Sequence, residues 1–162
     1  MIIRVLIMFG FFVAASLATA QDDPAENTIW RAYGAMPGGG RYSALDQINR
    51  ETVSTLAVEW RHSTGHAARA AALGVGASYQ VTPLFVNDLL YICTPFNRVL
   101  ALDPQTGEEV WAFDPHEKIF DDDAIASTCR GVVYWQAESP RSNTTCEKRI
   151  FKGDRQSRMF AV

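Results

Sequence analysis

The sequence predicts an all-β fold made of antiparallel meanders, and three observations support it. Short apolar runs with many β-branched and aromatic residues recur along the chain. Turn-forming residues separate them at Asn87-Asp88, at 104–107 and at Gly153-Asp154. No long amphipathic helix pattern competes with these runs. The predicted strands are LAVEWRHS (56–63), VTPLFV (81–86), LLYICTP (89–95), RVLALD (98–103), EVWAFD (109–114), GVVYWQ (131–136), RIFK (149–152) and RMFAV (158–162).

A repeat with an offset of sixty residues refines this prediction. NRVLAL at 97–102 is echoed by SRMFAV at 157–162, and Leu90-Tyr91 is echoed by Ile150-Phe151. Several short strands that recur with such a period are typical of propeller blades. Two insertions, of which HAARAAALGVGAS at 66–78 is the first, account for the extra length. The alanines there favour a helical turn that the following glycines interrupt.

ALDPQTGEEVW at 101–111 joins two predicted strands through a turn, and four of its residues have a predicted role. Asp103 can accept backbone N–H groups across the turn, Pro104 fixes its own φ, and Gly107 can adopt a positive φ. Trp111 then offers a flat surface for packing between blades. A generic hairpin turn is the alternative interpretation, and the repeat argues against it.

Residues 1–20 are predicted to form a secretory signal peptide, which leaves 21–162 as the mature chain. Arg4 precedes an apolar run, and Ala18-Thr19-Ala20 forms a small-x-small cleavage site. An uncleaved membrane anchor is the alternative. Without Arg4, the mature chain has fourteen Lys and Arg against eighteen Asp and Glu, and it shows no basic patch that would bind nucleic acid.

Three cysteines in an exported chain predict one disulfide and one free thiol. Cys129 and Cys146 bracket a polar loop, and their pairing would contribute about 3 kcal/mol through loop entropy. Cys93 lies in the apolar run LLYICTP and is predicted to be a buried free thiol.

Motifs in order along the chain resemble the pyrroloquinoline-quinone (PQQ) dehydrogenases, a family of eight-bladed β-propellers. The string A-L-D-x-x-T-G-x-x-x-W at 101–111 resembles their tryptophan docking motif. W-x-x-Y-G at 30–34, G-x-R-Y-S-x-L-x-Q-I at 39–48 and V-E-W-R-x-x-T-G at 58–65 resemble the start of their mature chains. CRGVVYW at 129–135 resembles a later blade. The resemblance, which is strongest to the glucose dehydrogenase branch, implies a closing strand followed by about two blades of a truncated propeller.

The resemblance also implies a site. An arginine in the family's R-G-V context lies against the cofactor, which corresponds to Arg130, and a guanidinium can pair with a PQQ carboxylate in bidentate fashion. Gly131 would let the backbone approach the cofactor, and Trp135 stands where membrane-bound glucose dehydrogenases have a histidine. A structural salt bridge is the alternative role for Arg130. The catalytic carboxylate and the Ca²⁺ ligands are expected outside this chain.

The implied activity is oxidation of a sugar or alcohol in the periplasm, with ubiquinone or a cytochrome as electron acceptor and PQQ and Ca²⁺ as cofactors. Two blades cannot enclose a cofactor, so the chain alone is expected to be inactive. The alternative is a non-catalytic propeller scaffold of the outer-membrane assembly type, which shares the docking motif but has no need of Arg130.

Cleavage of the signal peptide should leave Gln21 as the first residue of the exported protein. N-terminal sequencing of protein recovered from the periplasm of a bacterial host tests this. Ala20→Leu should block processing, because the cleavage site needs small side chains. Wild-type protein that retains Met1 in the membrane fraction would instead indicate an uncleaved anchor.

Overall fold

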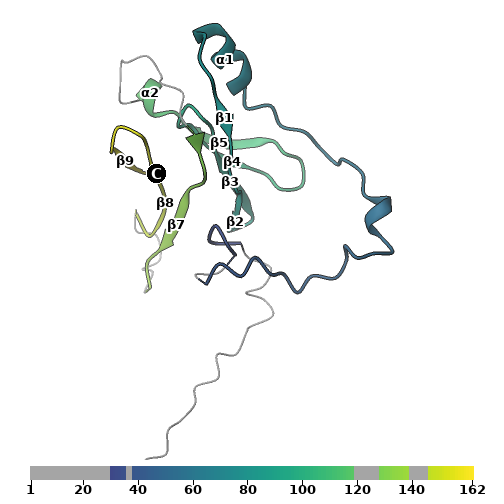
Figure 1. Ribbon diagram of the computed structural model, residues 1–162. Coiled ribbons are helices and arrows are strands. Elements are labelled where there is room, and N and C mark those ends of the chain that lie inside the picture. The colour runs from purple at the N-terminus through teal and green to yellow at the C-terminus, as the bar shows by residue number, and fades with distance from the viewer. Residues whose placement is uncertain (1–29, 36–37, 119–127, 139–145) are drawn as a thin grey trace, which may run out of the picture.

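The computed structural model describes residues 30–35, 38–118, 128–138 and 146–162, which form mainly short β-strands (Figure 1). The predicted signal peptide, residues 1–20, lies outside these ranges. The strands form two antiparallel sheets and one parallel pair. Among the described residues, no helix is long and apolar enough to cross a membrane.

The first sheet is a meander of four strands in the order β2-β3-β4-β5. A two-residue turn, Asn87-Asp88, joins its first hairpin, and both residues have positive φ (51° and 57°), as a type I′ turn requires. Trp30 extends this sheet by a single antiparallel bridge to Phe85. Its strands are β2 (Leu84–Val86), β3 (Leu89–Cys93), β4 (Val99–Leu102) and β5 (Glu109–Phe113).

The second sheet repeats the first with three strands, in the order β7-β8-β9. Its strands are β7 (Val133–Gln136), β8 (Lys148–Gly153) and β9 (Met159–Ala161). In the first sheet Tyr91 lies opposite Ala101, and in the second Phe151 lies opposite Ala161, sixty positions later in each strand. The predicted repeat is therefore confirmed in strand register.

The turns between the repeated strands also match. Thr94 N–H donates to the carbonyl of Arg98 over 2.9 Å, and Asp154 N–H donates to the carbonyl of Arg158 over 3.0 Å. Asn97, in the first of these turns, has a positive φ of 66°, and Ser157, sixty positions later, has 60°. The repeat thus includes the left-handed residue that closes each turn.

Within the described ranges, the remaining elements are a parallel pair, β1 (Ser78–Tyr79) with β6 (Thr128–Cys129), and three short helices. This pair departs from the purely antiparallel arrangement that we predicted. The segment 66–78 contains an α-helix, α1 (His66–Leu73), which ends at Gly74 in the left-handed conformation. A 3-10 helix, η2 (Val53–Thr55), and a one-turn helix, α2 (Pro115–Lys118), complete the list.

The β4–β5 turn behaves as its sequence predicts. Oδ1 of Asp103 accepts the backbone N–H groups of Gln105 (2.7 Å) and Thr106 (2.9 Å), and Gly107 has φ 72°. The N–H groups of Thr106 and Gln105 lower the pKa of the Asp103 carboxyl, since they favour its charged form. This turn is therefore held by the carboxylate of its first residue.

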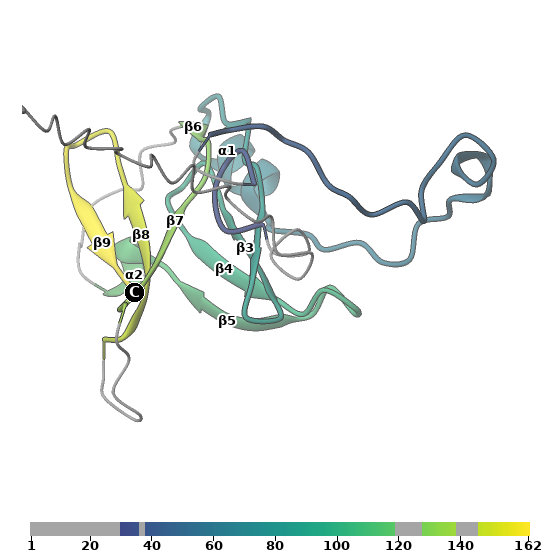
Figure 2. The ribbon, with the colours of Figure 1, turned by 90° about the horizontal axis from the view of Figure 1, so that it is seen from below.

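The prediction of a strand at 56–63 is wrong, because this segment docks on the β4–β5 turn through side chains instead of joining a sheet. Nε1 of Trp60 donates to the carbonyl of Pro104 over 3.0 Å, and Nδ1 of His62 lies 3.0 Å from the carbonyl oxygen of Gly107. A Cβ atom on Gly107 would lie 2.3 Å from Cε3 of Trp60. The indole thus covers the glycine face of the turn, while the segment that carries η2 projects away from both sheets (Figure 2).

The core lies between the two sheets, which stand side by side (Figure 2). Alternate residues of β3 and β4 face the second sheet. Phe113 and Phe160 meet across the gap with ring centroids 5.9 Å apart. The buried members of this cluster are Leu84, Val86, Tyr91, Cys93, Val99, Ala101, Cys129, Val132 and Ile150.

The outward faces of both sheets are apolar. A groove of about 770 Å³ crosses the outer face of the first sheet and is lined in part by Leu90, Ile92 and Leu102. On the second sheet, Trp135 and Met159 are 47% and 74% exposed. The exposed apolar side chains of the second sheet are typical of an assembly that continues on that side, whereas Ile92, Leu100 and Leu102 on the outer face of the first sheet are buried.

Gly107→Ala should destabilise the fold by about 2 kcal/mol, because alanine resists the positive φ and its Cβ would displace Trp60. Urea denaturation of the complete gene product, followed by tryptophan fluorescence, measures the change. Gly76→Ala is the matched control, since a Cβ there meets open space and its φ is not positive. Equal effects of the two substitutions would contradict the role of the covered turn.

Candidate functional site

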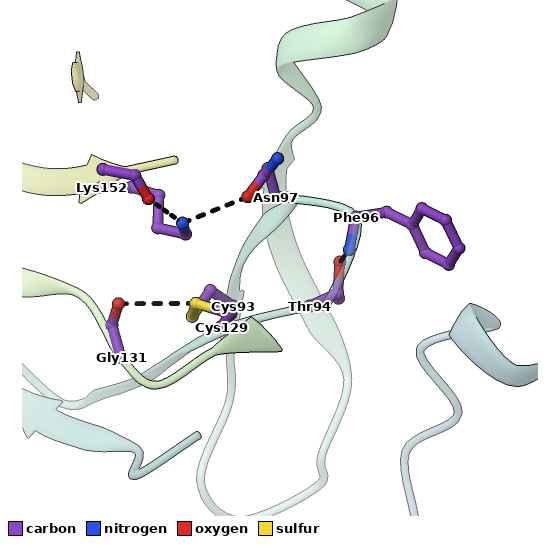
Figure 3. Close-up of a disulfide and its surroundings, with 8 residues drawn as sticks. Cys93, Thr94, Phe96, Asn97, Cys129, Gly131 and Lys152 are labelled. Atoms are coloured by element: carbon purple, nitrogen blue, oxygen red, sulfur yellow. Dashed lines mark hydrogen bonds between the residues drawn. A yellow bond between two sulfur atoms is a disulfide. The ribbon is translucent and has the colours of Figure 1, made fainter. Parts of the chain in front are cut away.

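One end of the sheet pair gathers the residues of the candidate site. The β3–β4 turn, the β8–β9 turn and the connection that precedes β7 all lie at this end, because consecutive antiparallel strands alternate their ends. Figure 3 shows Cys93, Asn97, Cys129, Gly131 and Lys152 here. We call it the disulfide end.

A disulfide joins Cys93 at the end of β3 to Cys129 in β6, with Cα atoms 6.0 Å apart. The predicted pairing of Cys129 with Cys146 is therefore wrong, and Cys146 is exposed and free. Loop entropy does not select the partner of Cys129, because the cost of closing a loop depends only weakly on its length. Packing selects the partner instead. Cys93 and Cys129 are 0% and 2% exposed, and both belong to the core between the sheets.

Arg130 follows this disulfide directly and is exposed. Its carbonyl accepts the backbone N–H of Thr82 over 3.2 Å, and its neighbour Cys129 pairs with Tyr79 in the parallel bridge. Within the described ranges, the Arg130 guanidinium has neither a hydrogen bond nor an ion pair. A fixed backbone thus carries a cation that no described side chain neutralises, so the described structure provides no partner for the alternative role as a structural salt bridge.

Gly131 is extended and has space around it. A Cβ atom on this glycine would meet only the carbonyl oxygen of Thr82, at 3.7 Å, which is an ordinary contact. Sγ of Cys129 lies 3.5 Å from the Gly131 carbonyl oxygen (Figure 3). Packing therefore does not require a glycine at this position, although its φ of 159° is one that residues with a side chain rarely adopt.

Trp135 lies apart from Arg130 in the described structure. It stands opposite Arg149 in the β7–β8 ladder, and its neighbour Tyr134 packs on the core from the other face of the sheet. Its ring is on the outward apolar face, where 47% of the residue is exposed. A role of Trp135 at a cofactor stays a prediction.

A buried lysine, Lys152, which was not predicted from the sequence, lies at the same end. Lys152 is 5% exposed, and its Nζ donates to Oδ1 of Asn97 over 3.2 Å and to the carbonyl of Gly153 (Figure 3). Burial lowers the pKa of its ammonium, against the opposing effect of the Asp154 carboxylate. The alternation of side chains along β8 could have predicted the burial of Lys152, because this residue lies on the same inward face as Ile150.

A polar pocket of about 340 Å³ lies between α1 and the β3–β4 turn. Its buried acid, Asp114, forms ion pairs with Arg69 (3.5 Å) and Arg98 (3.6 Å). The Arg69 guanidinium also lies 5.0 Å from the ring centroid of Phe96. These contacts attach α1 to the first sheet. In the described part of the chain, no group of three His, Cys, Asp or Glu could hold a metal ion.

Repeated antiparallel sheets that pack side by side and share one strand register are a portion of a β-propeller. A family model described as the glucose/ethanol/alcohol dehydrogenase β-propeller domain (PQQ) matches residues 30–162. The chain belongs to this family of PQQ-dependent dehydrogenases.

Curated relatives agree with this assignment. The chain is 35% identical over 156 residues to the quinate/shikimate dehydrogenase (quinone) of Acinetobacter baylyi, with 86% of this chain and 18% of the relative covered. It is 36% identical over 143 residues to the quinoprotein glucose dehydrogenase of Escherichia coli, with the same coverage, 86% and 18%. The chain thus spans about a fifth of the length of these relatives.

A solved structure supports the fold. The quinohemoprotein alcohol dehydrogenase ADHIIG of Pseudomonas putida HK5 matches with a TM-score of 0.61 at 24% identity. The match covers 86% of this chain and 18% of that one.

Lys152→Met should flatten the rise of stability with pH. Because burial lowers the folded-state pKa of Lys152, the unfolded state binds more protons between the folded and unfolded pKa values. Stability therefore rises with pH in that window, by up to about 1.4 kcal/mol per pH unit for one proton, and stays lower below the folded pKa. Urea denaturation of the complete gene product from pH 7 to 10.5 measures the slope. Lys148→Met, which removes an exposed lysine from the start of the same strand, is the control, and equal slopes for wild type and Lys152→Met would contradict the prediction.

Proposed function

We propose that this chain is the N-terminal part of an exported PQQ-dependent dehydrogenase that oxidises a sugar or an alcohol. Family membership supplies the class of reaction. The observation that carries the proposal is the exposed guanidinium of Arg130 on a braced backbone, with no partner among the described residues. Its relatives include dehydrogenases named for quinate, glucose and glycerol, so polyhydroxylated compounds are the class of substrate to test.

The residues at the disulfide end suit PQQ, a flat molecule with three carboxylates. Arg130 would hold one carboxylate through two parallel N–H donors, and Gly131 would leave room for the planar ring system because it lacks a side chain. When bound, PQQ supplies a quinone carbonyl that accepts hydride, with Ca²⁺ as Lewis acid. We place the catalytic carboxylate and the Ca²⁺ ligands outside this chain.

In this proposal the first sheet is one complete blade of an eight-bladed propeller, and the second sheet is three strands of the next. The segment 56–65, which here docks on the β4–β5 turn, would supply the closing strand once further blades complete the ring. The exposed apolar residues of the second sheet, Val133, Trp135 and Met159, support a chain that needs a neighbouring blade, so residues 21–162 alone should not catalyse.

The location and the electron acceptor follow from the same proposal. A cleaved signal at 1–20 would deliver the enzyme to the periplasm, where disulfides form readily. Electrons would then pass to ubiquinone or a cytochrome of the respiratory chain. A disulfide buried between the sheets is consistent with an oxidising compartment.

Arg130→Ala should weaken PQQ binding to the complete gene product roughly 10- to 100-fold, the value of one charge-assisted carboxylate contact. Quenching of tryptophan fluorescence during PQQ titration measures affinity, and dye-linked oxidation of glucose, quinate and glycerol measures activity. Arg155→Ala is the control, since Arg155 is an exposed arginine in the β8–β9 turn at the same end. Unchanged PQQ affinity in Arg130→Ala would remove Arg130 from the cofactor site.

The reading frame beyond codon 162 tests the same function independently. A frame that continues with further docking motifs, an aspartate base and Ca²⁺ ligands supports it. A verified stop after Val162, together with no PQQ binding by the chain, would refute a catalytic role for this gene product.

A further inference from the structure

The disulfide between Cys93 and Cys129 occupies a position that matters beyond stability. It joins the first sheet, through the end of β3, to the strand that leads directly into Arg130. Both half-cystines are buried, and the bond joins β6, which pairs with β1 outside the second sheet, to the first sheet (Figure 3). No other disulfide exists within the described part of the chain.

The backbone around Arg130 is fixed by a set of contacts that all involve the first sheet or the segment before it. Cys129 is held by the disulfide and by its bridge to Tyr79, and the Arg130 carbonyl is held by Thr82 N–H. Val132, two residues later, is buried in the shared core. In contrast, the second sheet does not pair with Arg130, because the β7 ladder starts only at Val133.

From this arrangement we propose that Cys93 and Cys129 are positioning residues for the cofactor contact of Arg130. The disulfide fixes Cys129, the residue before Arg130, to the first sheet and thereby sets the position of the guanidinium. The second sheet begins only at Val133, so it does not hold Arg130 in place. This inference rests on the proposed function, since it concerns the cofactor that Arg130 would bind. The free thiol of Cys146 takes no part in it.

A misplaced guanidinium loses bidentate geometry without losing its charge. Removal of the disulfide should therefore weaken PQQ binding less than removal of Arg130, by about tenfold. Its effect should also depend on Arg130. When Arg130 is already alanine, there is no guanidinium left to misplace, so the two changes should not be additive.

The test is a double-mutant cycle on the complete gene product. Cys93→Ala/Cys129→Val removes the bond while it keeps the site apolar and filled, and it is measured with and without Arg130→Ala. PQQ affinity by fluorescence quenching is the main readout, with thermal unfolding as a parallel measure of stability. Cys146→Ser is the matched control, because it removes the free thiol and leaves the disulfide.

The expected result is an approximately tenfold weaker PQQ affinity on loss of the disulfide, which falls below twofold in the Arg130→Ala background, and no change for Cys146→Ser. An equal loss in both backgrounds would overturn the proposal, since the disulfide would then act only through general stability. Unchanged affinity without the disulfide, while Arg130→Ala still binds weakly, overturns the positioning role alone. Unchanged affinity in Arg130→Ala overturns both this inference and the cofactor role of Arg130.

Hydrogen exchange provides a second measurement in case the cysteine variants do not fold. Wild-type protein is compared before and after reduction with a phosphine at low temperature. Reduction should speed exchange of the amides at 128–132 and leave β3 and β4 protected, since their ladder does not need the bond. Unchanged protection at 128–132 would overturn the proposal.

Discussion

The contact between the inner faces of the two sheets supports every other feature of this structure. Ala101, Val99 and Cys93 are fully buried there, and the small side chain of Ala101 lets the second sheet approach. Burial of such apolar area is the main favourable term in folding, and it dominates any single surface contact. The Lys152–Asn97 hydrogen bond and the aromatic pair Phe113–Phe160 cross this same interface, and the disulfide ties the segment that precedes β7 to the first sheet.

The opposite end of the interface is held by polar groups. Nδ2 of Asn87 donates to the Tyr134 hydroxyl over 2.9 Å, and the Lys148 ammonium lies 3.4 Å from the Asn87 amide oxygen. Two asparagines in tight turns of the first sheet thus contact the second sheet, Asn87 at one end and Asn97 at the other. These contacts at both ends fix the tilt of the two sheets as well as their separation.

Local chemistry made most of the fold predictable from the sequence. The repeat at sixty residues gave the register of Tyr91 with Ala101 and of Phe151 with Ala161, because strand periodicity and turn residues act over a few positions. The same holds for the Asp103 turn and the positive φ of Gly107. These features depend on neighbours in the sequence, which a reader of the sequence can see.

Features that depend on distant partners were not predictable in this way. Cys129 has one possible partner seventeen positions ahead and another thirty-six positions behind, and only the three-dimensional packing selects Cys93. The segment 56–63 has the composition of a strand, but its Trp60 and His62 contact carbonyl groups of the β4–β5 turn, and the segment pairs with no described strand. The position of Arg130 beside the disulfide could be expected from CRGVVYW, whereas its brace from Thr82 and Tyr79 could not.

The indole of Trp60 also has a consequence for the order of folding. Its hydrogen bond to Pro104 joins residues 44 positions apart, and the β4–β5 hairpin that provides the docking surface forms from neighbouring residues. A chain made from its N-terminus presents Trp60 long before that surface exists. Trp60 can dock only once that hairpin exists, so the covering of Gly107 follows formation of the hairpin. The segment that contains α1 then has to hold Trp60 against the turn.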